Sequence, residues 1–142
     1  MRSVKHLLEN KSSVIFSVDK HTSVLEALQL MMEQNISALL IMENGKLEGI
    51  FTERDYARKI ILKGRSSKDT DIAEVMTATL LVVAPADSIE YCMQQMTNHH
   101  IRHLPVVENN EVIGMISIGD LIRFTIEEQK KTIEQLQNYI SS

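Results

Sequence analysis

Apolar residues follow two spacings along the chain, and these spacings predict short strands and amphipathic helices. Apolar runs of four or five residues, rich in Val, Ile and Leu, predict buried strands. These runs cover residues 14–18, 38–42, 47–51, 80–83, 104–107 and 112–116. Apolar residues three and four apart predict helices over 24–32 and 89–96, and two further helices are expected to begin at Thr52 and Ser117. The predicted order is strand–helix–strand–strand–helix, twice.

Polar residues mark where these elements begin and end. Ser23 followed by Glu26 forms a capping box at the start of a helix, and Asp87 followed by Glu90 is a looser relative of it. Stretches rich in Asn and Gly, which accept a positive φ, predict tight hairpin turns. These turns lie at 43–46 and 108–111.

The two halves of the pattern are related by one constant shift, which places Gly49 on Gly114. With this shift, positions 18 to 55 align with positions 83 to 120 without a gap, and at least nine residues are identical. The identities include Val18, Gln29, Met31, Ile36, Leu39, Glu43, Asn44, Gly49 and Asp55 and the positions aligned with them. Chance matching predicts about two identities over such a stretch, so the chain carries an internal duplication.

The duplication predicts how the chain is organised. A half of about 60 residues has too little apolar surface for its own core, so the two halves must pack together. We expect an α+β fold in which two βαββα repeats pack with pseudo-twofold symmetry, with a C-terminal helix added. The polar stretch 63–70 is the natural connector. The expected division is 1–66 for repeat 1, 67–128 for repeat 2 and 129–142 for the helical extension.

Composition and charge narrow the class of protein. Of the 142 residues 44% are hydrophobic, with 5 Gly and 2 Pro, which excludes collagen-like and disordered chains. No apolar run approaches the roughly 20 residues that span a bilayer and no signal peptide is visible, so we expect a cytoplasmic protein without a membrane partner. The single Cys92 builds no disulfide framework. A net charge of −4 disfavours a nucleic-acid partner.

One signature, Gly-apolar-apolar-Ser/Thr-x-x-Asp, occurs at 49–55 and again at 114–120. With the run Arg102-His103-Leu104-Pro105-Val106-Val107, it resembles a tandem pair of CBS (cystathionine β-synthase) domains, a Bateman module, over about residues 1–128. The run 52–59 resembles the small stand-alone bacterial members of the family. The resemblance implies regulatory binding of adenosine-containing ligands, such as AMP, ATP, NAD(H) or S-adenosylmethionine, in clefts between the repeats.

The resemblance assigns Thr52 and Asp55 to one cleft and Ser117 and Asp120 to the other. In the family the Asp holds the ribose hydroxyls and the hydroxyl residue lies near phosphate. Elementary chemistry agrees, because free N–H groups at a helix start attract anions and a carboxylate accepts hydrogen bonds from a ribose diol. The same spacing also suits a structural helix cap, and this alternative stays open.

Basic residues beside the first signature favour an anionic ligand in an otherwise acidic chain. Arg54, Arg58 and Lys59 lie within two turns of the helix start, so some of them can face one cleft. A solvated helix face explains the same cluster equally simply.

The second copy has a different set of polar residues. Arg102 and His103 enter its strand, whereas Ser37 holds the position that matches Arg102 and carries no charge. In the family, apolar strand residues enclose the adenine ring. The resemblance assigns this role to Leu39 and Pro105. The two clefts are therefore unlike, and a ligand whose phosphates meet basic residues of both repeats is plausible.

The residues give no sign of a metal site or of catalysis. His99 and His103 have the spacing of a metal pair, but a strand starts at Ile101 between them, and no Cys or carboxylate completes a ligand set. Cys92 aligns with Ala27 on a buried helix face and has no base beside it. Without a paired nucleophile and base, we expect no enzyme.

The last predicted helix outruns the repeat by about three turns. Its apolar residues keep a spacing of three and four, with Gln129 in the same seam. They are Ile122, Ile126, Ile133, Leu136 and Ile140. This face packs on a partner chain or on the N-terminal segment, or else it belongs to a frayed tail. The family commonly forms disc-shaped dimers, so the resemblance implies a homodimer.

Together these features predict a non-enzymatic sensor. It binds an adenine nucleotide, with no metal, and alters an unidentified regulated protein or its own assembly. The alternative is a ligand-free structural module that acts through dimerisation and the C-terminal helix.

Overall fold

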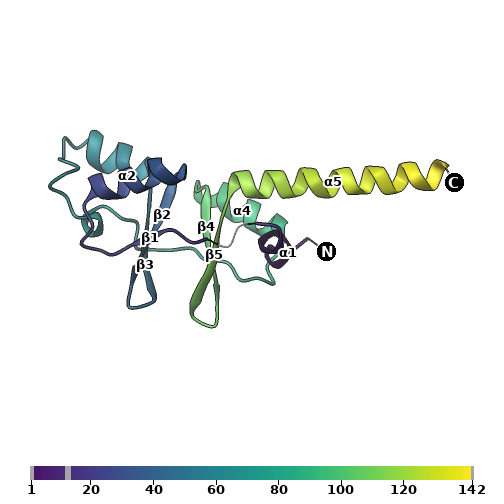
Figure 1. Ribbon diagram of the computed structural model, residues 1–142, viewed down its shortest axis with the longest axis horizontal. Helices are drawn as coiled ribbons and strands as arrows, with labels where there is room; N and C mark the ends of the chain where they lie inside the picture. The colour runs from purple at the N-terminus through teal and green to yellow at the C-terminus, as the bar shows by residue number, and fades with distance from the viewer. Residues whose placement is uncertain (1, 12–13, 142) are drawn as a thin grey trace.

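The computed structural model describes residues 2–11 and 14–141 (Figure 1). The first half contains α1 (Val4–Glu9), β1 (Ser17–Val18), α2 (Val24–Gln34), β2 (Ala38–Glu43), β3 (Lys46–Thr52), α3 (Glu53–Asp55) and the π-helical η1 (Tyr56–Ile61). The segment that joins the halves, residues 62–79 and called the connector from here on, holds the short 3-10 helix η2 (Ile72–Glu74). The second half contains α4 (Ile89–His99), β4 (His103–Glu108), β5 (Glu111–Ser117) and α5 (Ile118–Ser141).

The strands of the two halves pair in the same way. β2 and β3 are antiparallel, as are β4 and β5, and the two hairpins lie side by side (Figure 1). β1 adds a parallel edge to β2, with Val18 opposite Ile41. Val83 makes a parallel bridge to Val106, which is the equivalent pair in the second repeat. The predicted duplication and α+β fold are therefore confirmed.

The hairpin turns follow the sequence prediction. Asn44 and Gly45 have φ angles of 52° and 78°, and Asn109 and Asn110 have 52° and 64°. Two consecutive positive φ values turn the chain in the sense that suits twisted antiparallel strands, and Asn and Gly adopt them at low cost.

The first predicted strand of each half is shorter than expected. Only Ser17 and Val18 of 14–18 form a strand, and only Val83 of 80–83 pairs with a neighbour. Ile15 and Leu80 instead pack in the apolar cluster between the halves. Ile15 and Leu80 are thus apolar because they pack against neighbouring elements, and such packing does not require pairing in a sheet.

One predicted helix cap was wrong by a single position. Ser88, not Asp87, is the N-cap of α4, and its hydroxyl accepts from the Tyr91 N–H at 3.0 Å. Asp87 instead accepts from the Ala84 N–H in the preceding turn. The shift that places Gly49 on Gly114 also places Ser23, which caps α2 as predicted, on Ser88. The register of the duplication therefore identifies the correct cap.

Three apolar clusters form the core. One lies in the first half, one in the second half, and a smaller one, with Leu40, Ile50 and Met115, joins them. Val4 and Leu7 of α1 belong to the second cluster, where they pack near the start of α5. The N-terminal helix therefore covers the second half of the molecule.

A segment from elsewhere in the chain also crosses each half at its repeated glycine. A Cβ on Gly49 would lie 2.6 Å from Sδ of Met76 and 3.1 Å from the Thr77 carbonyl oxygen. A Cβ on Gly114 would lie 3.0 Å from Cδ2 of Leu8. Both glycines thus make room for a chain segment that precedes the first strand of the other half.

α5 continues well beyond the body of the molecule, and its C-terminal end lies far from both hairpins (Figure 1). Residues 129–141 are nearly all exposed. Among the helices of the described residues, none is both long and apolar enough to cross a membrane.

Candidate ligand-binding site

Both signatures sit where a strand turns into a helix, and both form the reciprocal cap that their spacing allows. Thr52 Oγ1 accepts from the Asp55 N–H at 3.2 Å, and Asp55 Oδ2 accepts from the Thr52 N–H at 3.0 Å. Ser117 Oγ accepts from the Asp120 N–H at 3.1 Å, and Asp120 Oδ2 accepts from the Ser117 N–H at 2.8 Å. Each aspartate therefore fixes a helix start, whatever else it does.

The carboxylate of Asp55 is buried and is surrounded by donors of the protein itself. Its Oδ1 accepts from Thr77 Oγ1 and lies 3.1 Å from Lys59 Nζ, while Oδ2 also accepts from the Thr52 hydroxyl. Lys59 is held further by the carbonyl oxygen of Val75 at 2.9 Å. Both carboxylate oxygens of Asp55 therefore accept from groups of the protein itself.

The carboxylate of Asp120 is placed differently. Its Oδ2 accepts from Lys11 Nζ at 2.6 Å, and its Oδ1 accepts from the guanidinium of Arg123 at 2.7 Å. Burial opposes ionisation of Asp120, but hydrogen bonds from Lys11 and Ser117 outweigh it and hold the pKa of the carboxyl below its ordinary value. The Arg123 side chain is 72% exposed, so Oδ1 of Asp120 accepts from a group that faces solvent.

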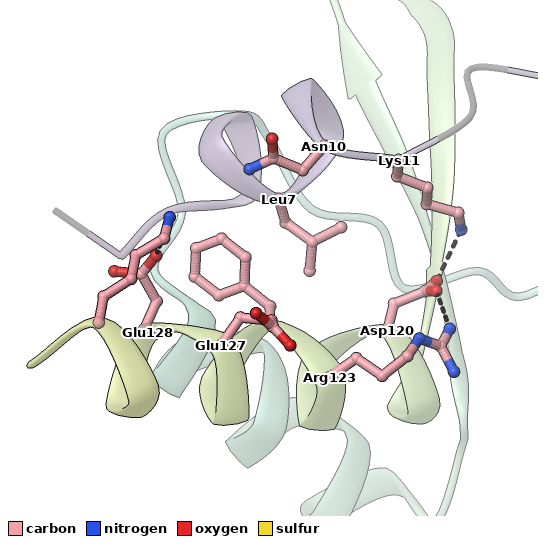
Figure 2. A pocket seen from close by; sticks show the side chains of 9 residues that line it. Leu7, Asn10, Lys11, Asp120, Arg123, Glu127 and Glu128 are labelled. Carbon is pink, nitrogen blue, oxygen red and sulfur yellow. Dashed lines mark hydrogen bonds and ion pairs between the residues drawn. The ribbon is translucent and has the colours of Figure 1, made fainter. Parts of the chain in front are cut away.

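A cavity of about 430 Å³ adjoins Asp120, between α1 and the first turns of α5 (Figure 2). Figure 2 shows Lys11 and Arg123 converging on the carboxylate from opposite sides, with Leu7 pointing into the space from α1. Glu127 lies further along α5. The lining comprises Leu7, Asn10, Lys11, Asp120, Arg123, Phe124, Glu127, Glu128 and Lys131. The space offers an apolar wall beside a cluster of charges of both signs.

Each signature aspartate takes a partner from the segment before the first strand of the other half. Thr77 comes just before the first strand of the second half and donates to Asp55, whereas Lys11 comes before the first strand of the first half and donates to Asp120. The sequence analysis did not single out Lys11 or Thr77. The alignment that revealed the signatures begins at position 18, so this exchange of segments lay outside it. One sequence signal could have revealed the exchange. The same shift, continued toward the N-terminus, places Lys11 on Met76, next to Thr77.

A third group of candidate residues joins the halves. Ser37 Oγ lies 3.0 Å from Nε2 of His103, so the two residues hydrogen-bond across the repeats. Burial, with the positive charges of Lys11 and Arg102 adding to it and the negative charge of Asp120 opposing it, lowers the pKa of His103. His103 is therefore held in its neutral form near pH 7.

The remaining candidates do not gather at either signature. Arg54 donates to the carbonyl oxygen of His100 at the end of α4. Arg58 and Arg102 are exposed, and neither lines the cavity at Asp120. Leu39 and Pro105 are buried within β2 and β4. Within residues 2–11 and 14–141, no three His, Cys, Asp or Glu side chains converge to hold a metal ion.

Comparison with known proteins gives the family. The model of the CBS domain matches residues 4–62 and 72–127. A protein with CBS domains from Burkholderia ambifaria is 45% identical, with a TM-score of 0.87 over 89% of this chain and 96% of its own. The mitochondrial CBS domain-containing protein CBSX3 of Arabidopsis thaliana is 42% identical over 123 residues, and this chain spans 60% of its length.

A more distant structure shares the fold. It is the CBS domain pair of protein MJ0100 in complex with 5′-methylthioadenosine and S-adenosyl-L-methionine. Its identity to this chain is 23%, with a TM-score of 0.77 over 90% of this chain and 98% of its own. The two matched domains, the repeated signature and the shared fold place this chain in the family of proteins built from a tandem pair of CBS domains.

Proposed function

We propose that the chain is a non-enzymatic cytoplasmic sensor that binds an adenosine-containing ligand, such as AMP, ATP or NAD(H), at the Asp120 signature. CBS-pair proteins are generally regulatory. The observation that carries the proposal is the cavity beside Asp120, whose Oδ1 accepts a hydrogen bond from the exposed Arg123. We propose also that two chains form a homodimer and that the sensor acts on a further, unidentified protein.

The charges at Asp120 suit a nucleotide. A ribose diol can replace Arg123 at Oδ1, because both donate hydrogen bonds to a carboxylate. The displaced guanidinium is then free for phosphate, which it binds in a bidentate manner. The apolar wall that includes Leu7 and Phe124 provides a surface for the adenine ring. The complex of MJ0100 with two adenosine compounds supports the ligand class.

The first signature is the weaker candidate for a ligand. Asp55 is buried, and each of its oxygens already accepts from two groups of the protein. A ribose there would have to displace Lys59 and Thr77, which also hold η1 and the connector in place. We therefore propose one ligand per chain, at Asp120.

The ligand would act through the N-terminal segment. Lys11 ties the segment after α1 to Asp120, so a ligand at that carboxylate must share it with Lys11 or release it. Either outcome favours one packing of α1 against α5 over another, which is how binding shifts a conformational population.

Titration calorimetry with AMP, ATP and NAD(H) tests the site. We expect wild-type protein to bind at least one of them, and Asp120→Asn and Arg123→Gln to weaken that binding by about 10–100-fold, the range for hydrogen bonds to charged groups. Glu134→Gln, at an exposed position of the same helix outside the cavity lining, is the matched control and should bind like wild type. Circular dichroism of each variant checks folding. Binding that Asp120→Asn and Arg123→Gln leave unchanged would refute the assignment.

The alternative, a ligand-free scaffold, is favoured by a different observation. The apolar row on α5 is exposed over its whole length, with Ile133 at 54% and Ile140 at 81%. A thermal-shift screen separates the two proposals, because a ligand that binds only the folded protein must raise its melting temperature. No stabilisation by any adenine compound at millimolar concentration would favour the scaffold.

A further inference from the structure

The outer half of α5 extends into solvent. Residues 130–141 are exposed, whereas Leu121 and Phe124 of the same helix are buried against the body. Figure 1 shows this half projecting past α1. Most helical stability in proteins comes from packing of an amphipathic face, so the exposed apolar face of this half is suited to cover by another surface.

Five exposed apolar residues of α5 form one seam together with the polar Gln129. The spacing of these six residues alternates between four and three, which is the heptad repeat of a coiled coil. The a positions are Ile126, Ile133 and Ile140, and the d positions are Ile122, Gln129 and Leu136. The five apolar residues of the seam are 45–81% exposed. Leu121 and Phe124 fall at the c and f positions, so the seam faces away from the body.

The residue types at the a and d positions influence how many helices associate in a coiled coil. All three a positions are β-branched Ile, which favours two parallel strands where Leu is at d, as at Leu136, whereas Ile at d, as at Ile122, favours a larger number. Gln129 is the one polar d residue, and two Gln side chains in one layer can hydrogen-bond to each other, because each amide both donates and accepts. A single polar layer fixes the register of such a pair at some cost in stability.

The charged residues beside the seam favour parallel over antiparallel pairing of the two helices. Arg123 and Lys130 occupy e positions, whereas the g positions are the uncharged Thr125, Thr132 and Tyr139. In a parallel pair each e residue faces a g residue of the other copy, so Lys130 meets Thr125 and no like charges oppose each other. In the antiparallel pairing that keeps the apolar layers together, e faces e, and the two copies of Lys130 meet. Neighbouring charges are engaged within the helix, since Lys130 lies 3.8 Å from Glu127.

We propose that α5 pairs with α5 of a second copy of this chain as a parallel two-stranded coiled coil along the seam from Ile122 to Ile140. The inference names the surface of the proposed homodimer and is independent of the ligand at Asp120. Parallel pairing places the two bodies at the same end of the coiled coil, with their N-terminal segments beside its start, since α1 packs on the first turns of α5.

Size-exclusion chromatography with light scattering on the full chain tests the pairing. Wild type should have twice the chain mass of 16.2 kDa. Ile133→Asp should give the mass of one chain, because it places two carboxylates in an apolar layer, and Gln135→Asp, off the seam in the same turn, should stay dimeric. Both side chains are exposed in the protomer, so neither variant threatens the fold of the body. A monomeric wild type overturns the homodimer itself, and a dimer that survives Ile133→Asp overturns only this surface.

Disulfide trapping tests the orientation. The one native cysteine, Cys92, is buried, so Leu136→Cys adds a single accessible thiol. In the parallel pair the two copies of residue 136 share one layer, and mild oxidation should link them efficiently. In the antiparallel pair residue 136 would lie beside residue 126 of the other copy, about 15 Å from its counterpart. Failure to cross-link, together with cross-linking in a mixture of Leu136→Cys and Ile126→Cys chains, would overturn the parallel arrangement.

Discussion

Lys11 Nζ lies 2.6 Å from Oδ2 of Asp120, although the two residues are far apart in the chain. Lys11 also donates to the carbonyl oxygen of Met115 on β5, so one ammonium group fastens the N-terminal segment to the second signature. The Asp120 side chain is 9% exposed, and a carboxylate so buried needs compensating donors. The stability of the second half therefore depends on a residue that precedes the first strand of the first half.

Lys11→Met keeps much of the side-chain volume and removes the charge. We expect it to lower the free energy of unfolding at pH 7 by about 1–3 kcal/mol, because it leaves a buried carboxylate short of one charged donor. Lys5→Met, on the exposed face of α1, is the control and should change stability by less than about 0.5 kcal/mol. Urea denaturation measures both variants. Equal stability of the two would show that the Lys11 contact contributes nothing.

The same pair predicts a pH dependence. The folded-state pKa of Asp120 is below its unfolded value, so its contribution to stability is present above the unfolded pKa and is lost as pH falls through the folded pKa. Without Lys11 the folded pKa rises, and protonation begins at higher pH. The difference in unfolding free energy between wild type and Lys11→Met should be largest near pH 7 and should shrink below about pH 4, the ordinary pKa of Asp. A gap that stayed constant down to pH 3 would contradict this coupling.

Asp55 should behave as a structural residue. Asp55→Ala removes the helix cap and leaves Lys59 and Thr77 without their acceptor, so we expect a loss of about 2–4 kcal/mol in unfolding free energy. Glu53→Ala, at an exposed position in the same turn, should cost less than about 0.5 kcal/mol. Chemical denaturation measures both. A mild effect of Asp55→Ala, together with lost nucleotide binding, would instead make Asp55 the ligand residue.

The duplicated pattern of the sequence accounts for most of the fold. The helices, the hairpins and their turns follow from local spacing, and the shift between the repeats relates Val18 to Val83 and Ser23 to Ser88. The extent of the first strands could not be predicted. Ile15 and Leu80 are apolar because they fill the space between the halves, and local sequence does not distinguish that role from pairing in a sheet.

The candidate site was only partly predictable for a related reason. The spacing Thr52-x-x-Asp55 and its copy at Ser117 predict a helix cap and an anion site equally well. What distinguishes the two copies is the set of donors that reach each carboxylate, and Lys11 comes from a distant segment. Long-range contacts of this kind depend on how the halves exchange segments, which periodicity does not report.

His103 predicts a second pH dependence. It arises because burial disfavours the charged form of the side chain, whereas the charged form of Asp120 is favoured by its hydrogen bonds. Burial lowers its folded-state pKa, so the unfolded chain binds more protons as pH falls below about 6.5, the ordinary pKa of His. Stability should therefore decline as pH falls through that range. His103→Gln retains an amide near the Ser37 hydroxyl but does not titrate, so its stability should decline less between pH 7 and the folded pKa of His103. Thermal melts across pH measure the slopes, and identical slopes would exclude His103 as the source.

The two repeated glycines predict unequal costs for the same substitution. In Gly49→Ala the new Cβ meets Met76 and also the backbone oxygen of Thr77 at 3.1 Å, so a backbone segment must move. In Gly114→Ala it meets only the Leu8 side chain, whose methyl groups can rotate away. We expect Gly49→Ala to cost about 1–3 kcal/mol and Gly114→Ala clearly less. Denaturation curves measured side by side give the ranking, and a larger loss at Gly114 would contradict the packing of the connector on β3.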